Sequence, residues 1–162
     1  MSNSRVVVLG VSAALAAIAV GARAAGVIEL RARGVQVYVC KAARTGFAWS
    51  LTGPDATLST AAGIPAGRHF AGPAWQATDG SIVVGEVVAS GSAEGAVPWL
   101  VLRATSHSGA GRFAGVTYVT RTSTSGGLPP SGGCDATHAG SSTRVPYRAT
   151  YSFFAAPPAA KP

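Results

Sequence analysis

The sequence lacks the features that mark membrane-spanning and nucleic-acid-binding proteins. Charged residues make up only 12% of the chain, and its Lys and Arg residues are scattered singly rather than gathered in runs. The basic footprint of a nucleic-acid-binding protein is therefore missing, although a net charge of +7 still favours anionic partners. The main apolar run covers residues 6–20, which is short of the roughly 20 residues that a membrane-spanning helix needs.

That apolar run has the features of a secretory signal peptide. Arg5 precedes it, and Ala22 and Ala24 flank Arg23 at the spacing that a signal peptidase prefers. We expect cleavage after Ala24, which makes residues 1–24 a signal-peptide helix; an uncleaved N-terminal anchor is the alternative. No cysteine follows the run for lipid attachment. The prediction is a secreted or periplasmic protein with no membrane span after signal cleavage.

Removal of the signal peptide leaves a chain of single-domain size. We expect a linker at residues 25–33, one domain at 34–154 and a disordered Pro/Ala-rich tail at 155–162. Loss of Arg5 and Arg23 lowers the net charge from +7 to +5. A moderately basic surface of this kind suits a small molecule or an anionic cell-surface ligand, and we expect no nucleic acid as a partner.

Cysteine is scarce, with one residue at position 40 and one at position 134. In an exported domain two cysteines most often form one disulfide, so we expect a Cys40–Cys134 bond. Closing a loop of this length stabilises a fold by roughly 4–5 kcal/mol at most in the chain-entropy model. Two buried thiols, or metal ligation by the pair, are the alternatives.

Beyond the signal peptide, no long segment carries apolar residues at helical spacing. Short runs rich in β-branched and aromatic residues are separated by Gly, Pro and Ser, which is typical of all-β proteins. The fold class is therefore all-β, a small antiparallel β-sandwich or barrel with one disulfide. The expected strands are residues 34–40, 46–51, 81–89, 97–105, 112–120 and 144–154, with 56–59 as a minor addition.

Alternating strand directions predict which loops share an end of this fold. If the strand at 34–40 runs up, Cys40 and the long loop at 121–143 both lie at the upper end, which allows the disulfide to Cys134. The segment 53–80 lies at the lower end, provided that any extra strands in it come in pairs. Three polar residues are therefore expected together at the lower end: His69, Asp79 and His107.

These three residues offer the chemistry of two kinds of site. Imidazole and carboxylate groups suit zinc or copper, and with Ser106 or Ser108 they supply the residue types of a hydrolase. However, no two histidines have a paired metal-site spacing, and no Gly-x-Ser-x-Gly motif is present. The alternative is that each residue only fixes its own turn. We predict no catalytic residue, metal or cofactor, and keep the three residues as weak metal candidates and as candidate ligand-binding residues.

The segment GRHFAGPAWQATDGS, residues 67–81, holds the remaining candidate, Trp75. Glycine and proline predict successive turns here, and Asp79 suits a tight turn into the next strand. Trp75 is the best candidate for an exposed aromatic that stacks on a ligand, although packing beneath the loop is favoured. Trp49 and Trp99 lie mid-strand among apolar residues, and we expect both in the core.

Two other patterns concern the strands at 81–89 and 97–105 and the loop that follows them. Glu86 and Arg103 are expected to pair across this hairpin, a surface contact of small energetic value. The glycine-rich residues 109–115 have the wrong spacing for a dinucleotide fingerprint and open a strand rather than a helix.

Several stretches together resemble a known family. They are GVQVYVCKA, GRHFAGPAWQATDGSIVVGEVV, VPWLVLRATSHSGAGRFAGVTYVTRTSTSGG, SGGCDATHAG and VPYRATYSFF. In this order they are similar to the secreted family catalogued as domain of unknown function 3455, over roughly residues 34–154. The resemblance implies a single-domain member with both cysteines in motif positions, and it implies no activity. The hypothesis is a non-catalytic binding or structural module; the alternative is a metal-dependent or hydrolytic enzyme around His69, Asp79 and His107.

Overall fold

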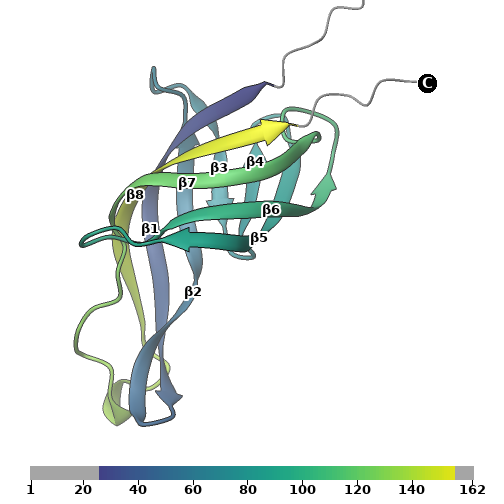
Figure 1. Cartoon of the computed structure of the whole chain (residues 1–162). Coiled ribbons are helices and arrows are strands. Elements are labelled where there is room, and N and C mark those ends of the chain that lie inside the picture. The colour runs from purple at the N-terminus through teal and green to yellow at the C-terminus, as the bar shows by residue number, and fades with distance from the viewer. Residues whose placement is uncertain (1–25, 156–162) are drawn as a thin grey trace, which may run out of the picture.

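The computed structural model describes residues 26–155, which form a closed antiparallel β-barrel with an arm projecting from one end (Figure 1). The strands follow one another around the barrel in chain order, and the last strand pairs with the first to close the ring. Over residues 26–155, no helix is long and apolar enough to cross a membrane. The strands are β1 (Val27–Ala43), β2 (Gly46–Ser59), β3 (Pro65–Phe70), β4 (Ala74–Ala77), β5 (Ile82–Gly91), β6 (Trp99–Ser108), β7 (Val116–Gly126) and β8 (Ser142–Ala155).

The all-β fold expected from the sequence is confirmed, and of the two architectures considered it is the barrel. Several segments differ from expectation, including residues 112–115, expected as strand but found in the loop before β7, and residues 121–126, expected as loop but found in β7. Residues 27–33, expected as linker, form the first half of β1, because Leu30 and Ala32 alternate with outward-facing polar residues and enter the core. Residues 65–77, expected as turns, form the β3–β4 hairpin. The expected signal peptide and the tail beyond Ala155 lie outside the described residues.

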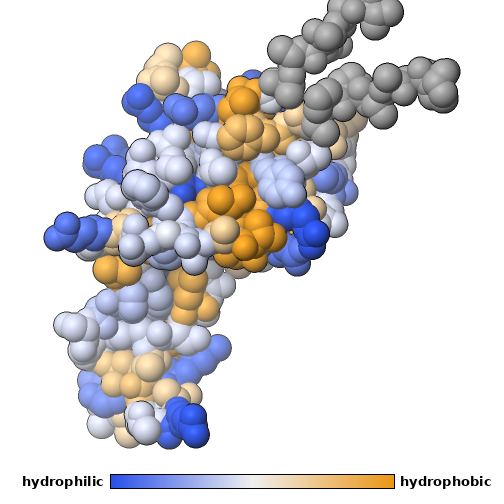
Figure 2. All heavy atoms as spheres, viewed as in Figure 1, coloured by the Kyte–Doolittle hydropathy of each residue, from blue (hydrophilic) through white to orange (hydrophobic). Residues whose placement is uncertain are grey.

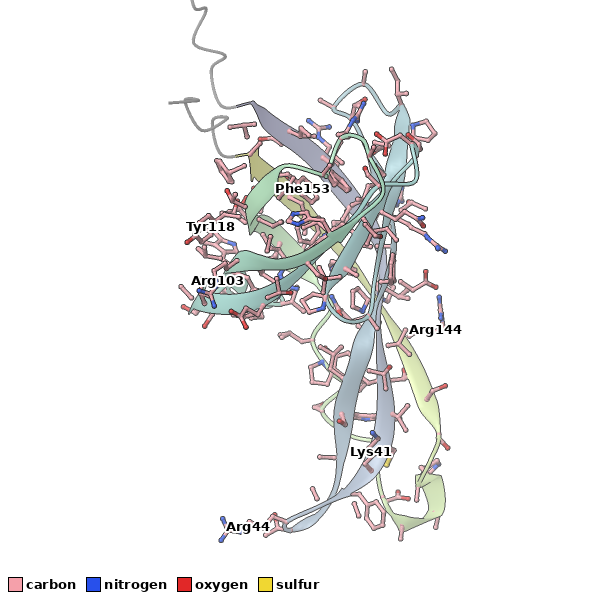
Figure 3. The ribbon with its side chains drawn as sticks, turned by 90° about the vertical axis from the view of Figure 1, so that its right-hand side faces the viewer. Lys41, Arg44, Arg103, Tyr118, Arg144 and Phe153 are labelled. Atoms are coloured by element: carbon pink, nitrogen blue, oxygen red, sulfur yellow. A yellow bond between two sulfur atoms is a disulfide. The ribbon has the colours of Figure 1, made fainter. Side chains whose placement is uncertain are left out.

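Aromatic side chains fill the barrel from the inside. Phe113 stacks on Phe153 with ring centroids 4.4 Å apart, and Trp75 meets Phe153 edge-on at 5.9 Å. Trp75 also contacts Tyr151 edge-on at 5.5 Å. An eight-stranded barrel has an interior that side chains can just fill or that holds one small ligand, and these buried rings fill part of it. Figure 3 shows Phe153 inside the barrel, with Arg103 and Tyr118 at its outer edge.

The arm is the part of the β1–β2 hairpin that continues beyond the barrel, together with the chain that leads into β8. It begins at a β-bulge, where the register of β1 and β2 shifts between Val37 and Tyr38. The Thr52 hydroxyl, on the bulged strand, donates a hydrogen bond to the Val37 carbonyl at 2.9 Å. Lys41 lies on the arm and Arg44 at its tip (Figure 3). We call the barrel end next to the arm the arm end, and the opposite one the far end.

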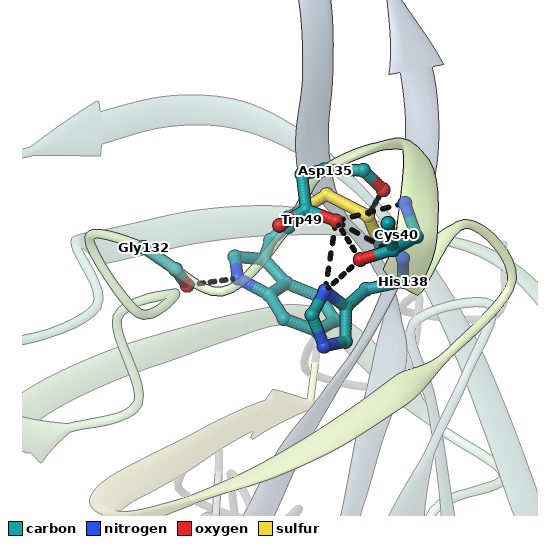
Figure 4. Close-up of a disulfide and its surroundings, with 7 residues drawn as sticks. Cys40, Trp49, Gly132, Asp135 and His138 are labelled. Carbon is teal, nitrogen blue, oxygen red and sulfur yellow. Dashed lines mark hydrogen bonds and ion pairs between the residues drawn. A yellow bond between two sulfur atoms is a disulfide. The ribbon is translucent and has the colours of Figure 1, made fainter.

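The predicted disulfide is confirmed, and it fastens the loop before β8 to the arm. Cys40 and Cys134 have their Cα atoms 5.3 Å apart. Backbone hydrogen bonds join Cys40 to Gly140 and Ser141, and the Trp49 indole N–H donates to the Gly132 carbonyl at 2.9 Å (Figure 4). Trp49, opposite Cys40 in the register, is therefore half-buried on the arm rather than in the core, because β2 has already left the barrel at this point.

The cross-strand pair expected between β5 and β6 is also confirmed. Glu86 lies opposite Arg103 in the register, and the Arg103 Nε–H donates to the carboxylate at 3.1 Å. Both side chains are exposed, so the pair contributes little to stability.

Candidate ligand-binding site

The structure does not bring His69, Asp79 and His107 together. His69 lies on β3 beside the β3–β4 turn, which is at the arm end. Asp79 lies in the β4–β5 turn and His107 near the end of β6, both at the far end. The strand directions were predicted correctly. However, residues 53–80 do not all lie at the lower end as expected, because β3 carries His69 to the arm end.

Asp79 is fully occupied as a turn residue. Its carboxylate accepts hydrogen bonds from the Ser81 hydroxyl at 2.6 Å, the Ser81 N–H at 3.0 Å and the Arg112 N–H at 2.7 Å. The Ser81 hydroxyl, followed by the Arg112 N–H, lowers the pKa of Asp79 to about 2. The carboxylate thus ties the β4–β5 turn to the β6–β7 loop at the far end.

His107 likewise spans a loop. Its Nε2–H donates to the Val116 carbonyl at 2.7 Å, which joins the end of β6 to the start of β7. Over residues 26–155, no group of three His, Cys, Asp or Glu side chains is placed to hold a metal ion.

His69 is buried inside the barrel in its neutral form. Its Nδ1–H donates to the Ala74 carbonyl at 2.9 Å, and its ring stacks on Trp75 with centroids 4.6 Å apart. Because a carbonyl only accepts, Nδ1 carries the proton and Nε2 keeps its lone pair. Burial lowers the pKa of His69 to about 4. At neutral pH the ring is therefore an uncharged wall of the arm end.

Trp75 is buried, as the favoured alternative had it, whereas Trp99 lies on the surface. Trp75 is fully buried behind His69, so it is not an exposed stacking platform. Trp99, expected in the core, is 49% exposed at the start of β6, because β6 faces the barrel with its even-numbered residues Leu100 and Leu102. A surface aromatic is therefore present, but at a different position.

Polar side chains gather around His69 inside the barrel, where a hydrophobic core is the usual filling. They come from β1, β3, β7 and β8, and all face inward because they alternate with outward residues. We call them the arm-end cluster: Gln36, His69, Arg121, Tyr147 and Tyr151.

Arg121 is the charged member of the arm-end cluster. It is only 9% exposed, and its Nε–H donates to the Pro98 carbonyl at 2.9 Å. Among residues 26–155, no carboxylate forms an ion pair with it. Burial raises the pKa of Tyr147 and of Tyr151, and the positive charge of Arg121 offsets part of this effect at both phenols. The phenols therefore stay protonated beside a guanidinium that lacks a counter-ion.

Several polar atoms of this region are buried without a hydrogen-bond partner among the described residues. They are Gln36 Oε1, Trp75 Nε1, Tyr147 OH and Tyr151 OH. Each such atom costs roughly 1–3 kcal/mol when nothing replaces its lost water. Native proteins keep few of them, and their concentration at one end of the barrel marks a place where a ligand or water completes the bonding.

A pocket of about 280 Å³ opens onto the cluster at the arm end. Gln36, His69 and Arg121 form part of its lining, and Leu51, Val87 and Leu100 add apolar walls. Concave sites of roughly 300–1,000 Å³ with a few convergent polar groups are typical of small-molecule binding.

A glycine allows the loop after β7 to reach the barrel mouth. Gly127 has a φ of +82°, and a Cβ added there would lie 2.8 Å from the Tyr147 Cβ and 2.9 Å from the Val97 Cγ1. Only glycine fits this close approach. The Gly127 carbonyl then accepts the Tyr38 hydroxyl at 2.6 Å, which closes the wall next to Gln36.

Sequence reasoning missed four of the five cluster residues. The alternation in GVQVYVC shows two faces, and here the inward face carries Gln36, Tyr38 and Cys40 while the valines face outward. Strand alternation could have identified Arg121 as a buried charge, because it lies two residues after the inward-facing Val119 and therefore faces the same side.

Comparison with known proteins adds the family and nothing on activity. No curated protein and no solved structure matches the chain. The family model described as "Protein of unknown function (DUF3455)" matches residues 22–155, which includes the whole barrel, the arm and both cysteines. The chain therefore belongs to the DUF3455 family.

Proposed function

We propose that the protein is an exported, non-catalytic binding module whose barrel takes up a small anionic ligand at the arm end. The observation that carries the proposal is Arg121, a guanidinium nine-tenths buried with no carboxylate partner among the described residues. Arginine keeps its charge in proteins, so burial cannot be relieved by loss of a proton. A buried charge without a counter-ion costs several kcal/mol, and an anionic ligand removes that cost.

The neighbours of Arg121 support an oxyanion as the bound group. The hydroxyls of Tyr147 and Tyr151 are buried without a hydrogen bond of normal geometry among the described residues, and they lie close enough to each other and to Arg121 to interact. An oxyanion accepts several hydrogen bonds at once, so one group satisfies the guanidinium and the phenols together. The Gln36 amide, which also lines the pocket, adds a contact to a polar atom elsewhere on the ligand.

The separation of His69 from Asp79 and His107 favours this module over the enzyme alternative. A catalytic site needs its base, nucleophile and orienting group within reach of one pocket. Asp79 and His107 instead hold turns at the far end, and His69 stacks in the barrel wall. No observation favours the enzyme, so we do not propose one.

Export is part of the same proposal. The disulfide between Cys40 and Cys134 is typical of oxidising compartments, and the signal-peptide pattern of residues 1–24 precedes the barrel. Mass spectrometry of the exported protein is expected to find an N-terminus at Ala25; an N-terminus at Met1 would contradict cleavage.

The test is a titration with acetate and with inorganic phosphate, followed by two-dimensional NMR. The Trp75 indole N–H lies beside the cluster and reports on it, as does the Arg121 Nε–H. We expect saturable shifts of both signals in the millimolar range, and loss of these shifts in Arg121→Gln. Arg121→Lys keeps the positive charge but lacks the planar guanidinium with its several N–H donors, and it should bind more weakly than the native protein.

The matched control is Arg103→Gln, which removes an exposed arginine on the outer face and should bind like the native protein. Signal dispersion in each spectrum checks that the variant is folded. No saturable shift in the native protein, or equal shifts in folded Arg121→Gln, would overturn the proposed function.

A further inference from the structure

An apolar surface adjoins the arm-end pocket on the outside of the barrel. Leu51 and Val87 line the pocket and are still 55% and 52% exposed, and Val88 and Trp99 are exposed nearby on β5 and β6. Figure 2 shows hydrophobic surface gathered over β5 and β6. Exposed apolar groups that gather beside a pocket mark a binding surface rather than ordinary solvent contact.

A groove lies on this surface next to the pocket. It has a volume of about 360 Å³ and runs between the end of β5, the start of β6 and β7. Ala89, Trp99 and Val101 give it an apolar lining. Leu100 and Arg121 belong to the linings of both the groove and the pocket, so the two adjoin at these residues.

We infer that the ligand is an anionic amphiphile with a single hydrocarbon chain, whose charged head binds at Arg121 and whose chain lies in the groove along Leu100 and Trp99. The inference rests on the proposed function and names the substrate class of that site. The positive charge of Arg121 in the pocket matches the charged head of such a molecule, and the apolar walls of the groove match its hydrocarbon chain.

The size of the surface favours an amphiphile over a protein partner. A standard protein–protein interface takes roughly 20–30 residues from each side. Among residues 26–155, the exposed large apolar side chains beside the pocket, which would form the centre of such an interface, are only four: Leu51, Val87, Val88 and Trp99. A hydrocarbon chain is narrow enough to be covered by this number of side chains.

The test is a series of straight-chain carboxylates from acetate to decanoate, each kept below its micelle concentration and titrated calorimetrically into the exported, oxidised protein. Each methylene that enters the groove should tighten binding roughly fourfold, the ratio that corresponds to about 0.8 kcal/mol per buried CH₂. The gain should stop once the chain is longer than the groove. Decanol, with the same chain and no charge, should bind much more weakly than decanoate.

Variants separate the head from the chain. Trp99→Ser and Val101→Thr, which change groove residues outside the pocket, should flatten the dependence on chain length and leave the affinity for acetate unchanged. Arg121→Gln should weaken every carboxylate. Ile64→Thr is the matched control, because Ile64 is 62% exposed in the β2–β3 connection at the far end, and it should change nothing.

The outcomes distinguish the two proposals. Absence of binding for every carboxylate overturns the proposed function. Saturable acetate binding with no dependence on chain length overturns this inference alone. A chain-length dependence unchanged in Trp99→Ser and Val101→Thr also overturns it. So does a sedimentation experiment in which Trp99→Ser converts a dimer to a monomer while carboxylate binding stays as in the native protein, because the surface is then an interface between copies.

Discussion

At residue 69, a histidine occupies a place in the barrel where a charge would be costly. The Ala74 carbonyl holds its Nδ1–H, and the Trp75 ring lies parallel to it with planes 4° apart. These contacts fix the tautomer and leave Nε2 with its lone pair, able to accept a hydrogen bond. Because His69 is buried in the pocket wall, its protonation in mild acid destabilises the folded state.

We predict that stability falls between about pH 6.5 and pH 4 because of His69. The pKa of His69 is lowered from 6.5 to about 4 by burial. In this window the unfolded chain binds a proton that the folded chain excludes, so the free energy of unfolding decreases as the pH falls. The shift corresponds to on the order of 3 kcal/mol. Urea unfolding at pH 7, 5.5 and 4 measures it.

His69→Phe should remove most of this pH dependence, whatever it does to the stability at pH 7. His138→Gln, on the exposed arm, is the control and should keep the native dependence. An equally steep loss of stability in His69→Phe would mean that other groups cause the acid sensitivity.

The tryptophans show what a single sequence can say about individual residues. Alternation along a strand separates two faces, but a shift of one residue exchanges inside and outside. Trp99 belongs to an apolar run in which both faces look suitable for a core, and only the closure of the ring decides which one is buried. Trp75 was expected among turns, because Gly72 and Pro73 interrupt the sequence pattern of the two short strands β3 and β4.

Among the elements, β5, β6 and β8 were predicted nearly in full, the long strands β1 and β2 only in part, and the short strands β3 and β4 not at all. β5, β6 and β8 carry β-branched or aromatic residues over eight or more positions, and their ranges are close to those expected. β3 and β4 are interrupted after a few residues by Ala71–Pro73, so they read as loop. The strand directions were still correct, because the two missed strands form a hairpin and reverse the chain twice. The placement of His69 failed for the same reason.

The arm depends on the disulfide more than on packing. Outside the barrel, the β1–β2 hairpin has no core to lie on, and the loop before β8 is held by Cys40–Cys134, the Trp49–Gly132 hydrogen bond and a few backbone bonds. Asp135 caps the short 3₁₀ turn at Ala136–His138 within this loop. A two-stranded ribbon alone is marginally stable in water, so the covalent link carries much of the order here.

We predict that replacing both cysteines by serine lowers the free energy of unfolding by up to roughly 4–5 kcal/mol, the chain-entropy value for a loop of this length. The loop at residues 128–141 should also become sensitive to protease, because its main tether is lost. Urea unfolding and limited proteolysis at low denaturant measure the two effects. A loop that stays protected in the variant would show that the hydrogen bonds of Trp49 and Cys40 hold it without the disulfide.

Across the whole molecule, the barrel interior is divided between two functions. The far end holds stacked apolar rings such as Phe113 and Phe153, and the arm end holds the arm-end cluster with its unpaired polar atoms. Burial of the apolar rings at the far end stabilises the fold and offsets the cost of the buried polar atoms at the arm end. The all-β class and the disulfide follow from composition and alternation alone, whereas this division depends on which strands meet across the ring. No local pattern records that information.

The closed ring also has a consequence for how the chain folds. Neighbouring strands form hairpins between residues close in sequence, but the ring is complete only when β1 finds β8, where Val39 pairs with Ser142 and Val27 with Phe154. Bringing such distant residues together costs loop-closure entropy. The Cys40–Cys134 bond removes most of that cost, because Ser142 is then only a few residues from the cross-link.

The oxidised chain should therefore refold faster than the double serine variant, by up to roughly 30-fold from loop-closure entropy alone. Stopped-flow tryptophan fluorescence after dilution from urea measures both rates, and equal rates would place ring closure after the rate-limiting step. If the rates differ as expected, the Cys40–Cys134 bond has two roles. It holds the loop before β8 to the arm in the folded structure, and during folding it sets the rate at which β1 and β8 pair.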